Sequence, residues 1–264
     1  MTWLSVQGRN ARLKALDFGG SGLAILLLHG LAGTASEWEE TAASLTASHR
    51  VVALDQRGHG RSERRPADVS RVAFVADAVA AIEQLKLAPV VLIGQSLGGH
   101  TALLVAAERP DLVRALVVAE ASPAEAEAGS AAKIESLLSA WPVPFASRAE
   151  AQAFFGGDTL AGRAWARSLE EGEGGLVPGF DTDVMVAAIA AATGAYWDVW
   201  VSIHAPTLVV RAEKGDLAED EAEAMVRTLP AAQLVSIAGA GHDVHLDAPE
   251  AWREVVQDFL AGLS

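Results

Sequence analysis

Six short apolar runs recur along the chain, each too short for a helix of ordinary length. They consist almost entirely of Val, Leu, Ile and Ala, and four of them end at Gly, His, Asp or Glu. Such runs are typical of strands covered on both faces, as in a parallel sheet. The runs cover residues 24–28, 50–54, 90–93, 115–119, 207–210 and 233–237. Residues 3–7 and 12–18 alternate more regularly, which is typical of an antiparallel edge.

Amphipathic stretches separate these runs and predict helices over residues 36–45, 71–85, 97–108, 219–229 and 249–261. Ser70 and Asp247 are candidate cap residues, and Pro249 suits a first helical position, where no N–H is needed. The alternation predicts the α/β class, with a doubly wound, mostly parallel sheet of about eight strands. Ligands bind beyond the carboxyl ends of the strands in such sheets. The residues that close the strands are therefore the candidates for chemistry.

One segment, residues 123–200, interrupts the alternation with helical patches and no clear strand. It holds nine of the fifteen aromatic residues and a Gly-rich stretch at 172–175. We expect a helical cap inserted into a core formed by residues 1–122 and 201–264. Pockets are mostly lined by apolar and aromatic groups, which makes four tryptophans weak candidates for substrate contact: Trp141, Trp165, Trp197 and Trp200. The alternative is that these aromatics form a small core of their own.

The composition excludes several classes of function. The net charge of −14 disfavours nucleic acid and anionic membranes as partners, and no apolar run approaches the length of a membrane span. The absence of cysteine removes thiolate nucleophiles and Cys-ligated metals. We expect a cytoplasmic protein that acts on a small molecule without a metal or cofactor. A homodimer is left open.

The sequence Gly-Gln-Ser-Leu-Gly at 94–98 follows a predicted buried strand and opens a predicted helix. That context is what a G-x-S-x-G nucleophile elbow requires. The sharp turn would expose the Ser96 hydroxyl, and the backbone N–H of Leu97 would face a developing oxyanion. The residues after 24–28 include Leu31, whose backbone N–H would be the second oxyanion donor.

His242 lies in a loop of small residues just after the last predicted strand, which suits a general base for Ser96. His245 is the fallback, and His29 is expected to shape its own loop. The cluster of polar residues at 55–62 has the appearance of a catalytic site. We interpret it as a structural turn held by charged hydrogen bonds.

These motifs, at 29–33, 55–62, 94–99 and 239–242, resemble the α/β-hydrolase superfamily in order and spacing along essentially the whole chain. The resemblance implies a Ser–acid–His triad, with Ser96 matching the nucleophile and His242 the base. A serine at the elbow departs from the epoxide hydrolases and haloalkane dehalogenases of the superfamily, which need a carboxylate nucleophile.

Two carboxylates compete for the acid of the triad. Asp216 follows the strand after the cap and resembles the most common position in the family. Glu120 lies 24 residues after Ser96, which resembles the position in haloalkane dehalogenases and zearalenone-type lactonases. Either could also have a local structural role, Asp216 at an acidic helix start and Glu120 at a polar strand end. The sequence does not separate them, although Glu120 is marginally favoured.

The expected function is hydrolysis of a small apolar or aromatic carboxylic ester or lactone through an acyl-enzyme. Relatives with this triad also cleave carbon–carbon bonds, thioesters or amides, or act as perhydrolases. Because a fold does not fix a function, a non-catalytic small-molecule receptor is a further alternative, which turnover would distinguish.

Overall fold

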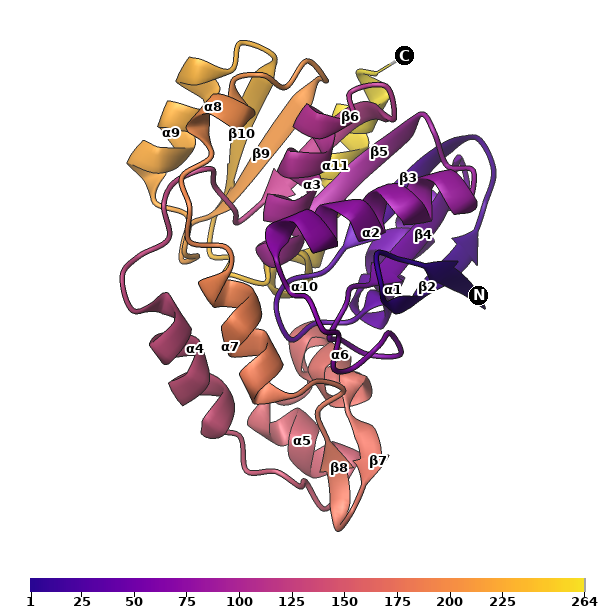
Figure 1. The fold of residues 1–264 in the computed structure, drawn as a ribbon, viewed down its shortest axis with the longest axis vertical. Coiled ribbons are helices and arrows are strands. Elements are labelled where there is room, and N and C mark those ends of the chain that lie inside the picture. Colours follow the sequence, from indigo (N-terminus) through magenta and orange to yellow (C-terminus); the bar gives the residue numbers. More distant parts are fainter. Residues whose placement is uncertain (264) are drawn as a thin grey trace.

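Eight strands form one sheet in the computed structural model, which describes residues 1–263 (Figure 1). The order across the sheet is β1-β2-β4-β3-β5-β6-β9-β10. The first two strands are antiparallel to their neighbours, and all other pairs are parallel. The mostly parallel sheet predicted from the apolar runs is therefore confirmed. The strands are β1 (Thr2–Gln7), β2 (Arg12–Gly19), β3 (Leu23–Leu28), β4 (His49–Asp55), β5 (Val90–Gln95), β6 (Val113–Ala119), β9 (Thr207–Ala212) and β10 (Ala232–Ile237).

Helices cover both faces of the sheet, which explains why its central strands are apolar on both sides. One apolar cluster lies between the sheet and the helices on the first face, and a second cluster lies on the opposite face. The first face carries α2 (Arg71–Gln84), α3 (Leu97–Glu108), α8 (Trp197–Trp200) and α9 (Glu219–Thr228). The second face carries the 3-10 turn η1 (Ala35–Trp38), α1 (Glu39–Leu45) and α11 (Pro249–Ala261).

The helix starts agree with some of the expected caps and not with others. Ser70 caps α2 by accepting a hydrogen bond from the backbone N–H of Ala73, as the sequence predicts. Asp247 does not cap α11, because it is the last residue of the short helix α10 (Val244–Asp247). Ala248 occupies the cap position before Pro249 and offers no side-chain acceptor.

Residues 123–200, here called the inserted segment, leave the sheet after β6 and return before β9. Most of the segment lies apart from the two helical layers that cover the sheet (Figure 1). Its elements are α4 (Ser130–Ser139), α5 (Arg148–Phe154), α6 (Leu160–Ser168), β7 (Glu170–Gly172), β8 (Gly175–Val177), α7 (Thr182–Ala190) and α8. The Gly-rich stretch forms the turn of the β7–β8 hairpin, a pair of strands that the sequence did not predict. α8 packs on the core helix α3.

The two crossings between the core and the inserted segment lie side by side. The backbone N–H of Tyr196 donates to Pro123 O at 2.7 Å, and that of Ala126 donates to Thr193 O at 3.3 Å. The segment thus enters and leaves at one place. No helix among residues 1–263 is long and apolar enough to cross a bilayer.

Candidate active site

Ser96 lies on a strained turn between β5 and α3. Its φ of 51° and ψ of −120° put a residue with a side chain in a region that usually needs glycine. Two glycines allow the turn, because a Cβ on Gly94 would lie 2.3 Å from Gly98 O and a Cβ on Gly98 would lie 2.2 Å from Leu28 O. This is the geometry of a nucleophile elbow.

The backbone N–H of Leu97 opens α3, where the first amides of a helix have no partner within the helix. Leu31 follows the end of β3, and its side chain packs in the same apolar cluster as that of Leu97. The structure thus brings these two residues together beside Ser96. Two N–H groups that converge beside a nucleophile can stabilise a negative oxygen, which is the role that the sequence predicts for Leu31 and Leu97.

His242 follows β10 in a loop that is tied to the elbow. The side-chain amide of Gln95, the residue before Ser96, donates to His242 O at 2.9 Å. Among the described residues no hydrogen bond joins Ser96 Oγ directly to the His242 ring. Such contacts are often long in unliganded enzymes. Sequence reasoning missed the role of Gln95, although its place inside the elbow motif could have drawn attention to it.

Glu120 contacts the Nδ1 atom of His242 from the end of β6. The distance from Nδ1 to Glu120 Oε2 is 3.3 Å, and the Glu120 side chain is fully buried while that of His242 is 35% exposed. Its carboxylate also accepts backbone N–H groups from Ala212 at 2.6 Å, Asp216 at 2.7 Å and Leu217 at 3.2 Å. Four donors therefore converge on this one carboxylate.

Asp216 also approaches the Nδ1 atom of His242. Its Oδ2 lies 3.4 Å from His242 Nδ1, but its side chain is 73% exposed. Burial lowers the pKa of His242, and the Glu120 hydrogen bond together with the charges of Asp216, Asp243 and Glu120 more than offsets it, so the pKa is raised above its usual value. The imidazolium is thus stabilised by two carboxylates, one buried and one exposed.

Two other histidines near the strand ends are fully buried and bonded to protein groups. His29 is fully buried, with Nδ1 against Gly30 O at 2.7 Å and Nε2 accepting the Gln56 N–H at 3.0 Å. His245, the fallback base, is buried, stacks on Trp38 at 4.1 Å and contacts Glu37 at 3.1 Å. Burial lowers the pKa of His245 to about 4, so it is neutral and faces the core.

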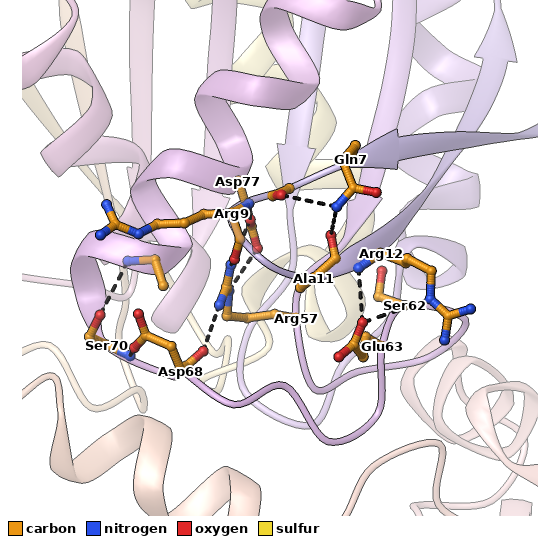
Figure 2. Close-up of polar contacts among 12 residues, drawn as sticks. Gln7, Arg9, Ala11, Arg12, Arg57, Ser62, Glu63, Asp68, Ser70 and Asp77 are labelled. Atoms are coloured by element: carbon orange, nitrogen blue, oxygen red, sulfur yellow. Dashed lines mark hydrogen bonds and ion pairs between the residues drawn. The ribbon is translucent and has the colours of Figure 1, made fainter.

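The polar cluster at 55–62 is held by a buried ion pair (Figure 2). Arg57 donates to both carboxylate oxygens of Asp77 at 2.7 Å, and to the backbone oxygens of Asp68 at 2.6 Å and Arg9 at 2.9 Å. These contacts join the segment after β4 to α2 and to the β1–β2 turn. The expected structural turn agrees with this arrangement.

The four tryptophans considered for substrate contact occupy different places. Trp200 is fully buried, and its indole donates to Met225 O at 2.9 Å, so it has no surface on which to meet a substrate. Trp197 packs partly buried against the same core cluster. Trp141 and Trp165 meet edge to face within the inserted segment, with ring centroids 5.8 Å apart.

Trp165 also joins the inserted segment to the histidine loop. Its indole N–H donates to the carboxylate of Asp243, the residue after His242, at 2.9 Å. α6, which carries Trp165, packs against η1 and α10. The inserted segment therefore rests beside His242, and no sequence pattern pointed to this bond. No three His, Asp or Glu side chains within residues 1–263 gather in a way that could hold a metal ion.

Comparison with known proteins places this arrangement in a family. The model of the alpha/beta hydrolase family matches residues 25–255. The chain is 30% identical to an sn-1-specific diacylglycerol lipase of Mus musculus over 251 residues, which cover 90% of this chain and 81% of the lipase. It is 27% identical to a 2-(acetamidomethylene)succinate hydrolase of Mesorhizobium japonicum over 250 residues, which cover 91% and 89%.

A solved structure of an E-2-(acetamidomethylene)succinate hydrolase superposes with a TM-score of 0.88 at 24% identity. The alignment covers 98% of this chain and all of the other. That likeness concerns the fold, and the family match extends from within β3 to within α11. The strained elbow, the histidine loop and the sequence match agree, and the chain belongs to the alpha/beta hydrolase family.

Proposed function

We propose that the chain is a serine hydrolase that cleaves a small apolar or aromatic carboxylic ester or lactone through an acyl-enzyme. The observation that carries the proposal is the strained Ser96 at the start of α3, together with the buried Glu120 against His242. A serine held at such angles costs free energy, which is typical of functional sites. The mouse relative is named as a lipase of diacylglycerol, which is an ester substrate.

In the proposed mechanism His242 takes the proton from Ser96 as its hydroxyl oxygen attacks the acyl carbonyl. The backbone N–H groups of Leu31 and Leu97 hold the oxyanion. His242 then gives the proton to the leaving oxygen and later activates the water that releases the acid. Glu120 keeps Nδ1 protonated and stabilises the imidazolium, since its buried carboxylate faces that nitrogen.

The inserted segment would act as a cap over this site. Its contact through Trp165 and Asp243 supports that role, because the bond ends one residue from His242. Trp141 belongs to the aromatic cluster around Trp165, which supports an apolar or aromatic acyl or alcohol group in the substrate.

The test is hydrolysis of p-nitrophenyl acetate and octanoate by the wild type, by Ser96→Ala and by Ser44→Ala. Ser44 lies on α1, where its hydroxyl donates to Thr41 O, and serves as the matched control. We expect the wild type and Ser44→Ala to turn over and Ser96→Ala to lose at least about 10³-fold in kcat. A fluorophosphonate should add once, at Ser96. Nitrophenol release by Ser96→Ala at the wild-type rate would refute the mechanism.

Binding without turnover by the wild type would favour the receptor alternative instead. A carbon–carbon hydrolase with the same triad would leave these esters nearly untouched while Ser96 still reacts with the phosphonate.

A further inference from the structure

Arg71 is a buried cation beside the elbow that has no acidic partner. It is 4% exposed and lies at the first position of α2. No carboxylate within residues 1–263 forms an ion pair with it. Burial lowers its pKa to about 10, so it is still charged at neutral pH. A buried charge without a counter-ion is costly, and a cation at a helix N-terminus is unfavourable as well.

The donors of Arg71 are mostly unused. Nη2 donates to Thr101 Oγ1 and, at 3.4 Å, to Leu97 O. Nε and Nη1 are buried and have no hydrogen-bond partner. Phe74 covers a face of the guanidinium, with the ring centroid 4.8 Å away, and leaves the donors at the edge free. Buried polar groups normally have a hydrogen-bond partner, so the free N–H groups of this guanidinium favour a bound acceptor. A carboxylate has two oxygens spaced to accept two of these N–H groups side by side.

His100 adds a second unpartnered group to the same place. It is 8% exposed, and neither of its ring nitrogens has a hydrogen-bond partner. The nearby charge of Arg71 adds to burial in lowering its pKa. The ring of Tyr196 packs edge-on against His100 at 4.8 Å. Tyr196 is only partly buried and lies at the return crossing of the inserted segment, so it forms the outer wall of the cluster.

We propose that Arg71 and His100, behind Tyr196, form a subsite for a carboxylate, and that the substrate is a monoester of a dicarboxylic acid. The substrate part of this inference rests on the proposed ester hydrolysis. His100 lies one helical turn from Ser96, whose carbonyl oxygen accepts the His100 N–H at 2.9 Å. One turn spans about 5.4 Å. Four carbon–carbon bonds of roughly 1.5 Å each, joined at tetrahedral angles in an extended zigzag, span about 5 Å from end to end, as in a glutarate chain.

The kinetic test compares monomethyl glutarate with methyl 5-oxohexanoate, in which an acetyl group replaces the carboxylate. The enzymes are the wild type, Arg71→Met and Arg61→Met. Arg61 is exposed, lies over Trp3 and serves as a control for the loss of one positive charge. The wild type and Arg61→Met should prefer the acidic ester in kcat/KM by about 10- to 100-fold, the range of charge-assisted hydrogen bonds. Arg71→Met should lose that preference, with a larger fall in kcat/KM on the acidic ester than on the neutral one.

Equal losses on both esters in Arg71→Met, or no preference in the wild type, would overturn the substrate assignment. Binding is then measured by calorimetry, with monomethyl glutarate and with acetate as ligands. The proteins are the inactive Ser96→Ala variant and the same variant that also carries Arg71→Lys. Arg71→Lys keeps the positive charge and serves if Arg71→Met fails to fold. Acetate binding that depends on Arg71, without a kinetic preference, assigns the site to a free carboxylate.

Absence of any Arg71-dependent binding refutes the subsite itself. Binding of the monoester by Ser96→Ala, when the wild type hydrolyses neither ester, would refute the proposed function and leave the subsite standing.

Discussion

Replacing Glu120 by Gln removes the buried charge that faces His242, and replacing Asp216 by Asn removes the exposed one. The two carboxylates lie at nearly the same distance from Nδ1, 3.3 and 3.4 Å, so distance alone predicts similar effects. Their surroundings differ, because the Glu120 side chain is fully buried and that of Asp216 is 73% exposed. The comparison therefore isolates the influence of burial on catalysis.

Coulomb's law at an effective dielectric constant near 20 gives about 5 kcal/mol between Glu120 and the imidazolium at 3.3 Å. An exposed ion pair such as that of Asp216 contributes about 1 kcal/mol or less. At 1.36 kcal/mol per factor of ten, we expect Glu120→Gln to lower kcat about 10²- to 10⁴-fold. Asp216→Asn should lower kcat less than about tenfold. Because 0.5 M salt screens the exposed pair in the wild type, it should remove most of the difference in kcat between the wild type and this variant.

The pH dependence supplies a second readout. The base works as neutral imidazole, so kcat/KM rises with pH through the His242 pKa. The Asp216 charge helps to raise that pKa. Asp216→Asn should therefore shift the acid limb of the profile to lower pH and leave the plateau nearly unchanged.

The assay is p-nitrophenyl acetate hydrolysis at 25 °C, with circular dichroism to check folding. Glu213→Gln is the matched control, because Glu213 is an exposed residue whose carboxylate accepts the Gly239 N–H and does not face His242. An Asp216→Asn loss equal to or larger than that of Glu120→Gln would refute the reasoning from burial.

Three further results are expected. Asp77→Asn leaves the Arg57 charge buried without its partner, so thermal denaturation should show a loss of about 3–5 kcal/mol; a change below 1 kcal/mol would contradict this. Ser70→Ala removes the cap of α2 and should cost about 1 kcal/mol, or about 2–4 °C in Tm, with kcat unchanged. Trp165→Phe removes the bond to Asp243, so amide hydrogen exchange in α6 should become faster, and unchanged exchange would show that this bond does not hold α6 in place.

Most elements of the sheet could be predicted because their apolar runs are continuous, too short for an ordinary helix and separated by amphipathic stretches. The hairpin β7–β8 could not, since its strands have three residues each and the first is Glu-Glu-Gly. Ser96 and His242 could be proposed from the sequence because each follows a strand within a distinctive local sequence. The buried Arg71 left no local signal, as a single arginine at a helix start is ordinarily exposed.

The sequence could not choose between Glu120 and Asp216 as the acid of the proposed triad, for a physical reason. The loop after β9 curls over the end of β6, so that the backbone N–H of Asp216 donates to the carboxylate of Glu120. Both candidates therefore reach the same nitrogen, and they are separated by depth of burial and by the three backbone N–H groups that bond to the Glu120 carboxylate. Depth of burial depends on how the two loops pack, which no spacing within one loop encodes.

The paired crossings at Pro123–Tyr196 and Ala126–Thr193 have a consequence for how such proteins diversify. A segment whose two ends meet can be exchanged for another of different length without altering the distance that the core must span. The scaffold that holds Ser96 and His242 can then be retained while the inserted segment is replaced as a module. We expect that grafting a foreign segment between these two crossings would change substrate selectivity while the elbow and the histidine loop are retained.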